Sequence, residues 1–205
     1  MDTSITSSFR DSGYVYIPGF LDETTVKTVS RYFEYSINSN NNGWIAATKS
    51  NDSNDVSKYC KYGDPLIDVI LENSINDFEA VVGEELLPTY SYSRVYMSGD
   101  ELKEHRDRPA CEYSATINIA TKGSEPWPIY MRSEGRETSC YILNPGDAVI
   151  YKGSEVYHWR NKMHNTNINV QIMLHYVAKY GEHKETKWDG RPSLGLPADT
   201  SIFRR

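Results

Sequence analysis

The residues with the clearest capacity for chemistry are His105 and Asp107, which are separated only by Arg106. In an extended strand, residues i and i+2 project to the same face, so this imidazole and this carboxylate can approach one cation from the same side. Exposed His–Asp pairs also arise by composition alone. The pair by itself is therefore weak support for a metal site.

A second histidine, His158, strengthens the metal interpretation. It follows a predicted turn at residues 144–147 and a predicted strand at residues 148–151. Two histidines and one carboxylate on facing strands form the facial triad of non-haem Fe(II) centres, which leaves coordination positions open. Zinc favours a closed tetrahedral site, often with thiolates, and the three cysteines of this chain are far apart with no CxxC pair. The sequence predicts His105, Asp107 and His158 as ligands of Fe(II), with no catalytic residue beyond them.

Other reactive side chains have ordinary explanations. His175 is interpreted as a hydrogen-bonded or exposed histidine, and Cys111 as a packing residue, because no base in the sequence is placed to activate its thiol. Arg108 either lies at the mouth of the site or makes a structural salt bridge. Trp127 and Trp159 either line a substrate pocket or belong to the core, where large aromatic side chains are common.

The candidate ligands belong to a series of short strands that begins near Pro88. In residues 169–177 the apolar side chains alternate with polar ones, which predicts that Val170, Ile172, Leu174 and Tyr176 share one face. Short strands separated by Gly, Pro and Asp turns are typical of a sandwich, barrel or jelly roll rather than of parallel βαβ units. The predicted strands of this part span residues 90–96, 113–120, 128–131, 139–143, 148–151 and 169–177.

The chain before Pro88 has a mainly helical pattern. A short strand closed by a Pro-Gly turn is predicted within residues 13–20, and Asp22 is the expected N-cap of a helix. A second helical region begins at Asp64-Pro65, with Leu66, Val69, Ile70, Phe78, Val81 and Val82 as its expected buried face. The polar runs at residues 38–43 and 50–58 are predicted loops.

Composition limits the classes of protein that the chain can represent. A length of 205 residues suits one domain. The formal net charge of −6 argues against binding to nucleic acid or to an anionic membrane, which requires a positive field. No signal peptide and no apolar run of about 20 residues is visible. Together with the unpaired cysteines, this predicts a reducing, cytoplasmic location. The oligomeric state is not predicted.

Two segments that contain the predicted metal ligands resemble those of a known family. Residues 96–107, YMSGDELKEHRD, are similar to the Y-x-x-G-x-x-x-x-x-H-x-D signature of 2-oxoglutarate/Fe(II)-dependent dioxygenases, especially the prolyl-hydroxylase-like branch. Residues 145–151, PGDAVIY, and His158 resemble that family's turn, strand and distal histidine. The likeness covers residues 88–177 well and the earlier part only generically.

The resemblance implies an α+β, mainly β fold: a double-stranded β-helix (jelly-roll) barrel with N-terminal helices packed on one side. We expect a single oxygenase domain over residues 1–205. Its parts are a helical flank with an opening strand at 1–87, the jelly-roll core at 88–178, and an extended tail at 179–205 that wraps the barrel without forming another element.

The resemblance also implies 2-oxoglutarate as a co-substrate whose far carboxylate is gripped by a basic side chain. The family commonly places an Arg or Lys a short way beyond the distal histidine, whereas residues 167–171 of this chain are NINVQ. Arg160 is the first candidate for the grip, with a surface cation as its alternative, and Arg94 is the second. Tyr96 matches a family tyrosine that often bonds the co-substrate. Thr116 is either a further polar contact or a routine strand residue.

The function that follows is a dioxygenase using Fe(II), 2-oxoglutarate and O2 to hydroxylate an unactivated C–H bond, with release of succinate and CO2. The primary substrate is expected to be a peptide or protein side chain or a small molecule. Two alternatives remain open. One is a non-haem iron oxygenase that does not use 2-oxoglutarate, and the other is a non-catalytic jelly-roll binding module.

Overall fold

The structure, a computed structural model, describes residues 3–38, 45–46, 59–123, 125–164 and 168–196. The predicted loops at residues 38–43 and 50–58 lie outside the described residues, apart from Asn38. Residues 197–205 of the predicted tail also lie outside them.

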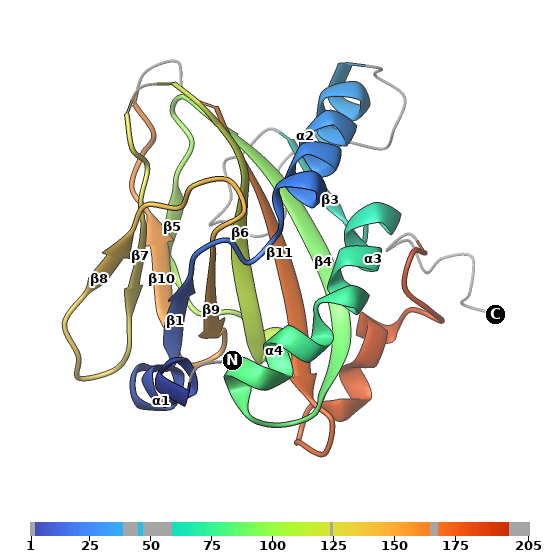
Figure 1. The fold of residues 1–205 in the computed structure, drawn as a ribbon, viewed down its shortest axis with the longest axis vertical. Helices are drawn as coiled ribbons and strands as arrows, with labels where there is room; N and C mark the ends of the chain where they lie inside the picture. The colour runs from blue at the N-terminus through green and yellow to red at the C-terminus, as the bar shows by residue number, and fades with distance from the viewer. Residues whose placement is uncertain (1–2, 39–44, 47–58, 124, 165–167, 197–205) are drawn as a thin grey trace.

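Two antiparallel sheets form the centre of the molecule (Figure 1). Within the residues described above, the larger sheet has seven strands in the order β1-β9-β6-β11-β4-β3-β2, and the smaller has four in the order β5-β10-β7-β8. This mainly β architecture with flanking helices confirms the predicted fold class. The strands are β1 Tyr14–Ile17, β2 Ile45–Ala46, β3 Tyr59–Tyr62, β4 Leu86–Met97, β5 Leu102–His105, β6 Tyr113–Lys122, β7 Ile129–Arg132, β8 Ser139–Tyr141, β9 Ala148–Lys152, β10 Tyr157–Arg160 and β11 Ile168–Ala178.

Strand β11 lies between β4 and β6 in the larger sheet, so both of its edges are paired through the backbone. Ile172, Leu174 and Tyr176 join the main apolar core, as the alternation predicts. Met173 and His175, on the other face, line a cavity between the two sheets. The period-2 geometry of a strand thus divides β11 into a structural face and a face available for function.

In the described part of the chain, four α-helices flank the larger sheet: α1 Thr3–Ser12, α2 Glu23–Asn38, α3 Pro65–Asn73 and α4 Ile75–Val82. Helices α2, α3 and α4 lie on the side of this sheet away from the smaller sheet (Figure 1). The ring centroids of Phe78 on α4 and Tyr176 on β11 are 4.3 Å apart, and the Tyr176 hydroxyl donates to the carbonyl oxygen of Leu71. Phe33 of α2 joins the same core.

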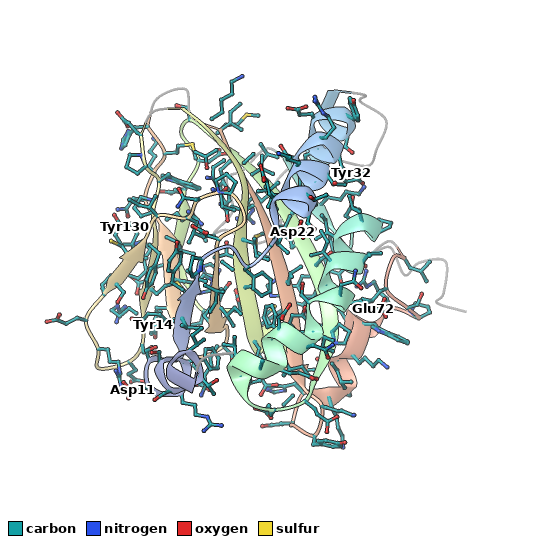
Figure 2. The ribbon with its side chains drawn as sticks, in the orientation of Figure 1. Asp11, Tyr14, Asp22, Tyr32, Glu72 and Tyr130 are labelled. Carbon is teal, nitrogen blue, oxygen red and sulfur yellow. The ribbon has the colours of Figure 1, made fainter. Side chains whose placement is uncertain are left out.

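The predicted helix starts are confirmed by their hydrogen bonds. Asp22, at the first turn of α2 (Figure 2), accepts bonds at Oδ1 from the backbone N–H groups of Thr24 and Thr25, at 2.9 and 3.0 Å. Asp64 caps α3 in the same way. The predicted second helical region is divided at Ser74 into α3 and α4. The prediction for Val69 is wrong, because its position on α3 leaves it 51% exposed.

The two sheets pack against each other through apolar side chains. Val149 and Tyr151 of the larger sheet share a cluster with Ile129 and Met131 of the smaller one. Within the smaller sheet, β10 lies between β5 and β7, and its register places His158 directly opposite His105. The sheet pairing therefore brings together two residues that are distant in sequence.

After β11 the segment Lys184–Gly190, η2, forms 3-10 turns interrupted by a kink at residues 187–189, so the prediction that the tail forms no further element is wrong. Arg191, which follows it, makes a buried ion pair with Asp68 at 2.9 Å and donates to the carbonyl oxygen of Thr89. These contacts hold the segment against β4 and α3. Local sequence propensity cannot predict them, because they join residues that are far apart in the chain. Among the described residues, no helix is both long and apolar enough to cross a membrane.

Candidate metal centre and its cavity

The side chains of His105, Asp107 and His158 converge at one point. His105 ends β5, His158 lies on β10, and Asp107 follows β5 with its backbone N–H bonded to the carbonyl oxygen of Gly153 at 2.8 Å. Oδ1 of Asp107 lies 3.5 Å from Nε2 of His105 and 3.4 Å from Nε2 of His158. The three ligand atoms all lie within 4.8 Å of one another. This spacing suits one shared cation.

Backbone carbonyl groups orient both imidazoles. Nδ1 of His105 lies 2.9 Å from the carbonyl oxygen of Lys103, and Nδ1 of His158 lies 3.1 Å from that of Val156. A carbonyl oxygen only accepts, so each Nδ1 carries a hydrogen, and Nε2 is the ring nitrogen that faces Asp107. The Nε2 atoms are therefore the ones placed to bind a metal, as is usual for metal-binding histidines.

Asp107 is ionised in this setting. Burial by itself raises the pKa of its carboxyl, but the imidazoles of His158 and His105 outweigh burial and hold the pKa well below its usual range. An ionised carboxylate is the form that binds a cation.

Gly153 is a part of the site that sequence analysis missed. A Cβ at this position would lie 2.1 Å from the carbonyl oxygen of Cys111 and 2.8 Å from Oδ2 of Asp107. The glycine therefore lets the backbone pass directly behind the carboxylate. Its sequence signal, Lys152-Gly153 at the end of a strand, indicates only an ordinary turn.

A cavity of about 300 Å³ lies beside the three side chains, between the two sheets. Its wall contains every site residue that the sequence predicts: His105, Asp107, His158, Tyr96, Arg160, Arg94 and Thr116. Of the residues with ordinary explanations, Arg108 and His175 also line it.

Arg160 is buried, with 2% of its surface exposed, so the alternative of a surface cation is wrong. It lies two residues after His158 on β10, so both side chains point to the same side. Nη1 donates to the carbonyl oxygen of Trp127 at 2.9 Å, and the guanidinium carbon lies 4.9 Å from the centroid of that ring. Nη2 has no hydrogen-bond partner among the described residues. Burial lowers the pKa of Arg160 to about 10.

Arg94 and Tyr96 form the neighbouring wall. Both are buried on β4, and Nη1 of Arg94 donates to the Tyr96 hydroxyl at 2.9 Å. The Tyr96 ring lies 4.8 Å from the ring of Trp127, over which Arg160 is stacked. Two buried cations and one phenol therefore occupy the same end of the cavity.

Residues 168–171 of β11, where this chain has no Arg or Lys, contribute to a network of side-chain amides. Thr116 donates to Oε1 of Gln171 at 3.0 Å. Nε2 of Gln171 donates to the side-chain oxygens of Asn169 and Asn118, at 2.5 and 3.3 Å. Thr116 therefore both lines the cavity and takes part in the side-chain hydrogen bonding of the larger sheet.

The structure distinguishes between the alternative interpretations of Arg108, Cys111 and the two tryptophans. Arg108 lines the cavity and also makes a bidentate ion pair with Asp189 of η2, with both distances 2.7 Å. Cys111 is buried, and burial raises the pKa of its thiol, as expected for a packing residue. Trp127 supports Arg160, whereas Trp159 stacks on Tyr130 of β7, away from the cavity.

His175 is buried and hydrogen-bonded, which agrees with one of its two predicted interpretations. Its Nδ1 lies 2.8 Å from Oγ of Ser114. Burial lowers its pKa to about 4, so the ring is neutral near pH 7. Its position in the cavity wall, close to Asp107, had no signal in the sequence.

The similarity of this chain to known proteins lies in its structure and not in its sequence. No protein-family model and no curated protein sequence matches the chain. The structure is similar to SnoK, a non-haem α-ketoglutarate-dependent carbocyclase of nogalamycin biosynthesis, with a TM-score of 0.69 and 15% identity over 96% of this chain and 93% of that one. It is also similar to a prolyl-4-hydroxylase of Pseudomonas putida, with a TM-score of 0.64 and 13% identity over 84% and 97%.

A third similar structure is HygX of Streptomyces hygroscopicus with nickel, 2-oxoglutarate and hygromycin B bound. Its TM-score is 0.65, with 12% identity over 88% of each chain. At such identities the likeness concerns the fold. The chain has the jelly-roll fold of the 2-oxoglutarate-dependent non-haem iron oxygenases, so the predicted resemblance is confirmed at that level.

Proposed function

We propose that this protein is an Fe(II)- and 2-oxoglutarate-dependent dioxygenase that hydroxylates an unactivated C–H bond. The observation that carries the proposal is the presence, in one cavity, of two different binding functions. One is the donor set of His105, Asp107 and His158. The other is Arg160, a buried cation with an N–H group that lacks a partner among the described residues.

The donor set fits Fe(II). Two imidazoles whose Nε2 atoms face one ionised carboxylate are the ligands of a facial triad, and such a triad leaves room for further ligands. Bound there with 2-oxoglutarate, Fe(II) would activate O2, so that oxidation of 2-oxoglutarate to succinate and CO2 is coupled to hydroxylation of the substrate.

Arg160 fits the far carboxylate of 2-oxoglutarate. A buried guanidinium without an anionic partner is unfavourable, and a carboxylate that accepts from Nη2 would relieve that cost through a charge-assisted bond. Arg94 and Tyr96, at the same end of the cavity, would complete the anion site, with Thr116 on the adjoining wall. The side chains present therefore replace the basic residue that the family commonly carries on the next strand.

The size of the cavity supports a limited class of primary substrate. A volume of about 300 Å³ is at the lower end of the roughly 300–1,000 Å³ of ligand pockets. It must accept the co-substrate together with the reacting group. We therefore favour a substrate that inserts only a small group, either a peptide or protein side chain or a small molecule. A cytoplasmic location belongs to the same proposal and is supported by the three free cysteines.

Of the two alternatives, an iron oxygenase without 2-oxoglutarate leaves the buried Arg160 without a role, and a binding module leaves the complete donor set without one. The test is to add Fe(II) and then 2-oxoglutarate to the purified protein without oxygen. We expect a weak visible charge-transfer band that is missing in His105→Ala. Iron binding without a band would favour the first alternative, and failure to bind iron would favour the second.

A further inference from the structure

The two oxygen atoms of the Asp107 carboxylate have different surroundings. Oδ1 faces the Nε2 atoms of His105 and His158. Oδ2 points the other way, toward Oγ of Ser114 at 3.3 Å. If Oδ1 binds a metal, as the proposed function requires, then Ser114 contacts the oxygen that remains.

The Ser114 hydroxyl has one proton and three polar neighbours. Besides Oδ2 of Asp107, it lies 3.1 Å from the carbonyl oxygen of Cys111 and 2.8 Å from Nδ1 of His175. Ser114 has 0% of its surface exposed. A carboxylate and a carbonyl only accept, so the hydroxyl proton must point toward that pair of oxygens to avoid repulsion between lone pairs.

Nδ1 of His175 must then be the donor to Ser114, because the hydroxyl has no second proton to offer. This requires the Nδ1–H tautomer, in which Nε2 keeps its lone pair. The ring lines the cavity and lies 4.5 Å from the ring of Tyr90. The backbone that carries this side chain is also held, because Thr89 donates to the His175 carbonyl oxygen at 3.0 Å.

We propose that His175 and Ser114 are positioning residues that form a hydrogen-bond relay, His175 Nδ1–H to Ser114 Oγ–H to Asp107 Oδ2, and that this relay leaves only Oδ1 for the metal. The proposal rests on the proposed function for the identity of the metal site. The hydrogen-bond order itself is a property of this chain. Residues that bond a metal ligand typically contribute about 10- to 100-fold in metal affinity or activity.

The tautomer is tested by ¹⁵N NMR of histidine-labelled protein at pH 7.5, with and without Zn(II) as a diamagnetic probe. The variant His175→Asn identifies the His175 signals by their loss. We expect a protonated Nδ1 and an unprotonated Nε2 in both states. A protonated Nε2 would overturn the relay. This NMR measurement does not require catalytic activity, so its result does not depend on whether the proposed function is correct.

The effect on the metal is tested by Mn(II) titration of variants that remain folded by circular dichroism. His175→Asn keeps an N–H donor close to the position of Nδ1, whereas His175→Leu has a similar size and no donor. We expect Asn to keep affinity within a few-fold of wild type, and Leu and Ser114→Ala each to lose about tenfold or more. The double variant Ser114→Ala/His175→Leu should lose no more than either single variant, because the relay acts as a unit.

Ser93→Ala is the matched control. Ser93 is another buried serine, it does not line the cavity, and its hydroxyl has no hydrogen-bond partner among the described residues. It should bind Mn(II) like wild type. Equal losses in His175→Asn and His175→Leu would overturn the relay in favour of a packing role. A wild-type protein that binds no metal would overturn the proposed function, while the NMR result would still decide the hydrogen-bond order.

Discussion

His105 and His158 are directly opposite each other across β5 and β10, and each bonds through Nδ1 to the carbonyl oxygen of the residue two positions before it. The same local contact therefore occurs on two neighbouring antiparallel strands. It turns both Nε2 atoms toward Asp107, so the backbone of the smaller sheet prepares the donor set before any ion arrives.

Replacement of a proposed ligand tests this arrangement most directly. His105→Ala or Asp107→Ala should abolish Fe(II) binding and succinate release, a larger loss than the roughly 10- to 100-fold typical of residues that only bond a ligand. Calorimetric Fe(II) titration and succinate assays measure the two effects. His164→Ala, an exposed histidine outside the cavity, should behave like wild type. Activity that survived in Asp107→Ala would refute the ligand assignment.

Arg160→Ala should raise the 2-oxoglutarate concentration needed for half-maximal turnover much more than it weakens Fe(II) binding. Loss of one partner of a buried charged pair costs about 2–5 kcal/mol, which corresponds to an increase of roughly thirtyfold or more. Arg136→Ala, which removes an exposed arginine paired with Asp11, is the control. An unchanged requirement would move the carboxylate grip to Arg94.

Gly153→Ala should disturb the carboxylate from behind. The added Cβ would overlap the carbonyl oxygen of Cys111, so either the β9–β10 turn or Asp107 must move. We expect a loss of about 1–3 kcal/mol in the free energy of unfolding, as for overpacking, together with weaker Mn(II) binding. Urea unfolding and Mn(II) titration check both effects. At Gly135 a Cβ has open space but the backbone φ is +71°, so Gly135→Ala should lower stability through backbone strain alone and leave Mn(II) binding unchanged.

The Tyr16–Asp147 hydrogen bond should make stability depend on pH at both ends of the scale. Burial raises the pKa of Asp147, but bonds from the Gly19 N–H, the Tyr16 hydroxyl and Asn144 outweigh it and lower the pKa, so this stability is lost as acid protonates the carboxylate below its usual pKa of 3.8. The bond to Asp147 raises the pKa of Tyr16 to about 12, so stability is also lost as pH rises from 10 toward 12.

Tyr16→Phe and Asp147→Asn, each alone and combined, measure this bond in a double-mutant cycle. We expect a coupling free energy of about 1.5–3 kcal/mol at pH 7, as for hydrogen bonds to charged groups. The coupling should diminish below the carboxylate pKa. A coupling that is equal at pH 7 and pH 2.5 would contradict the assignment of this bond to the ionised carboxylate.

The features that the sequence alone determined are local. The alternation of residues 169–177 follows from the two-residue period of a strand, and the helix starts at Asp22 and Asp64 follow from side chains that bond to nearby N–H groups. The same period predicted His105 and Asp107 on one side of the chain, and both line the cavity although Asp107 lies beyond the end of β5. These inferences need only the geometry of a few consecutive residues.

The tertiary structure decided what depends on residues far apart in the chain. It brought His158 opposite His105, buried Arg160 over Trp127, and placed His175 and Gly153 behind Asp107. Neither an arginine two residues after a histidine nor a glycine at the end of a strand differs locally from many others. Their roles arise from burial and from the partners left within reach, and only the packing of the two sheets determines both.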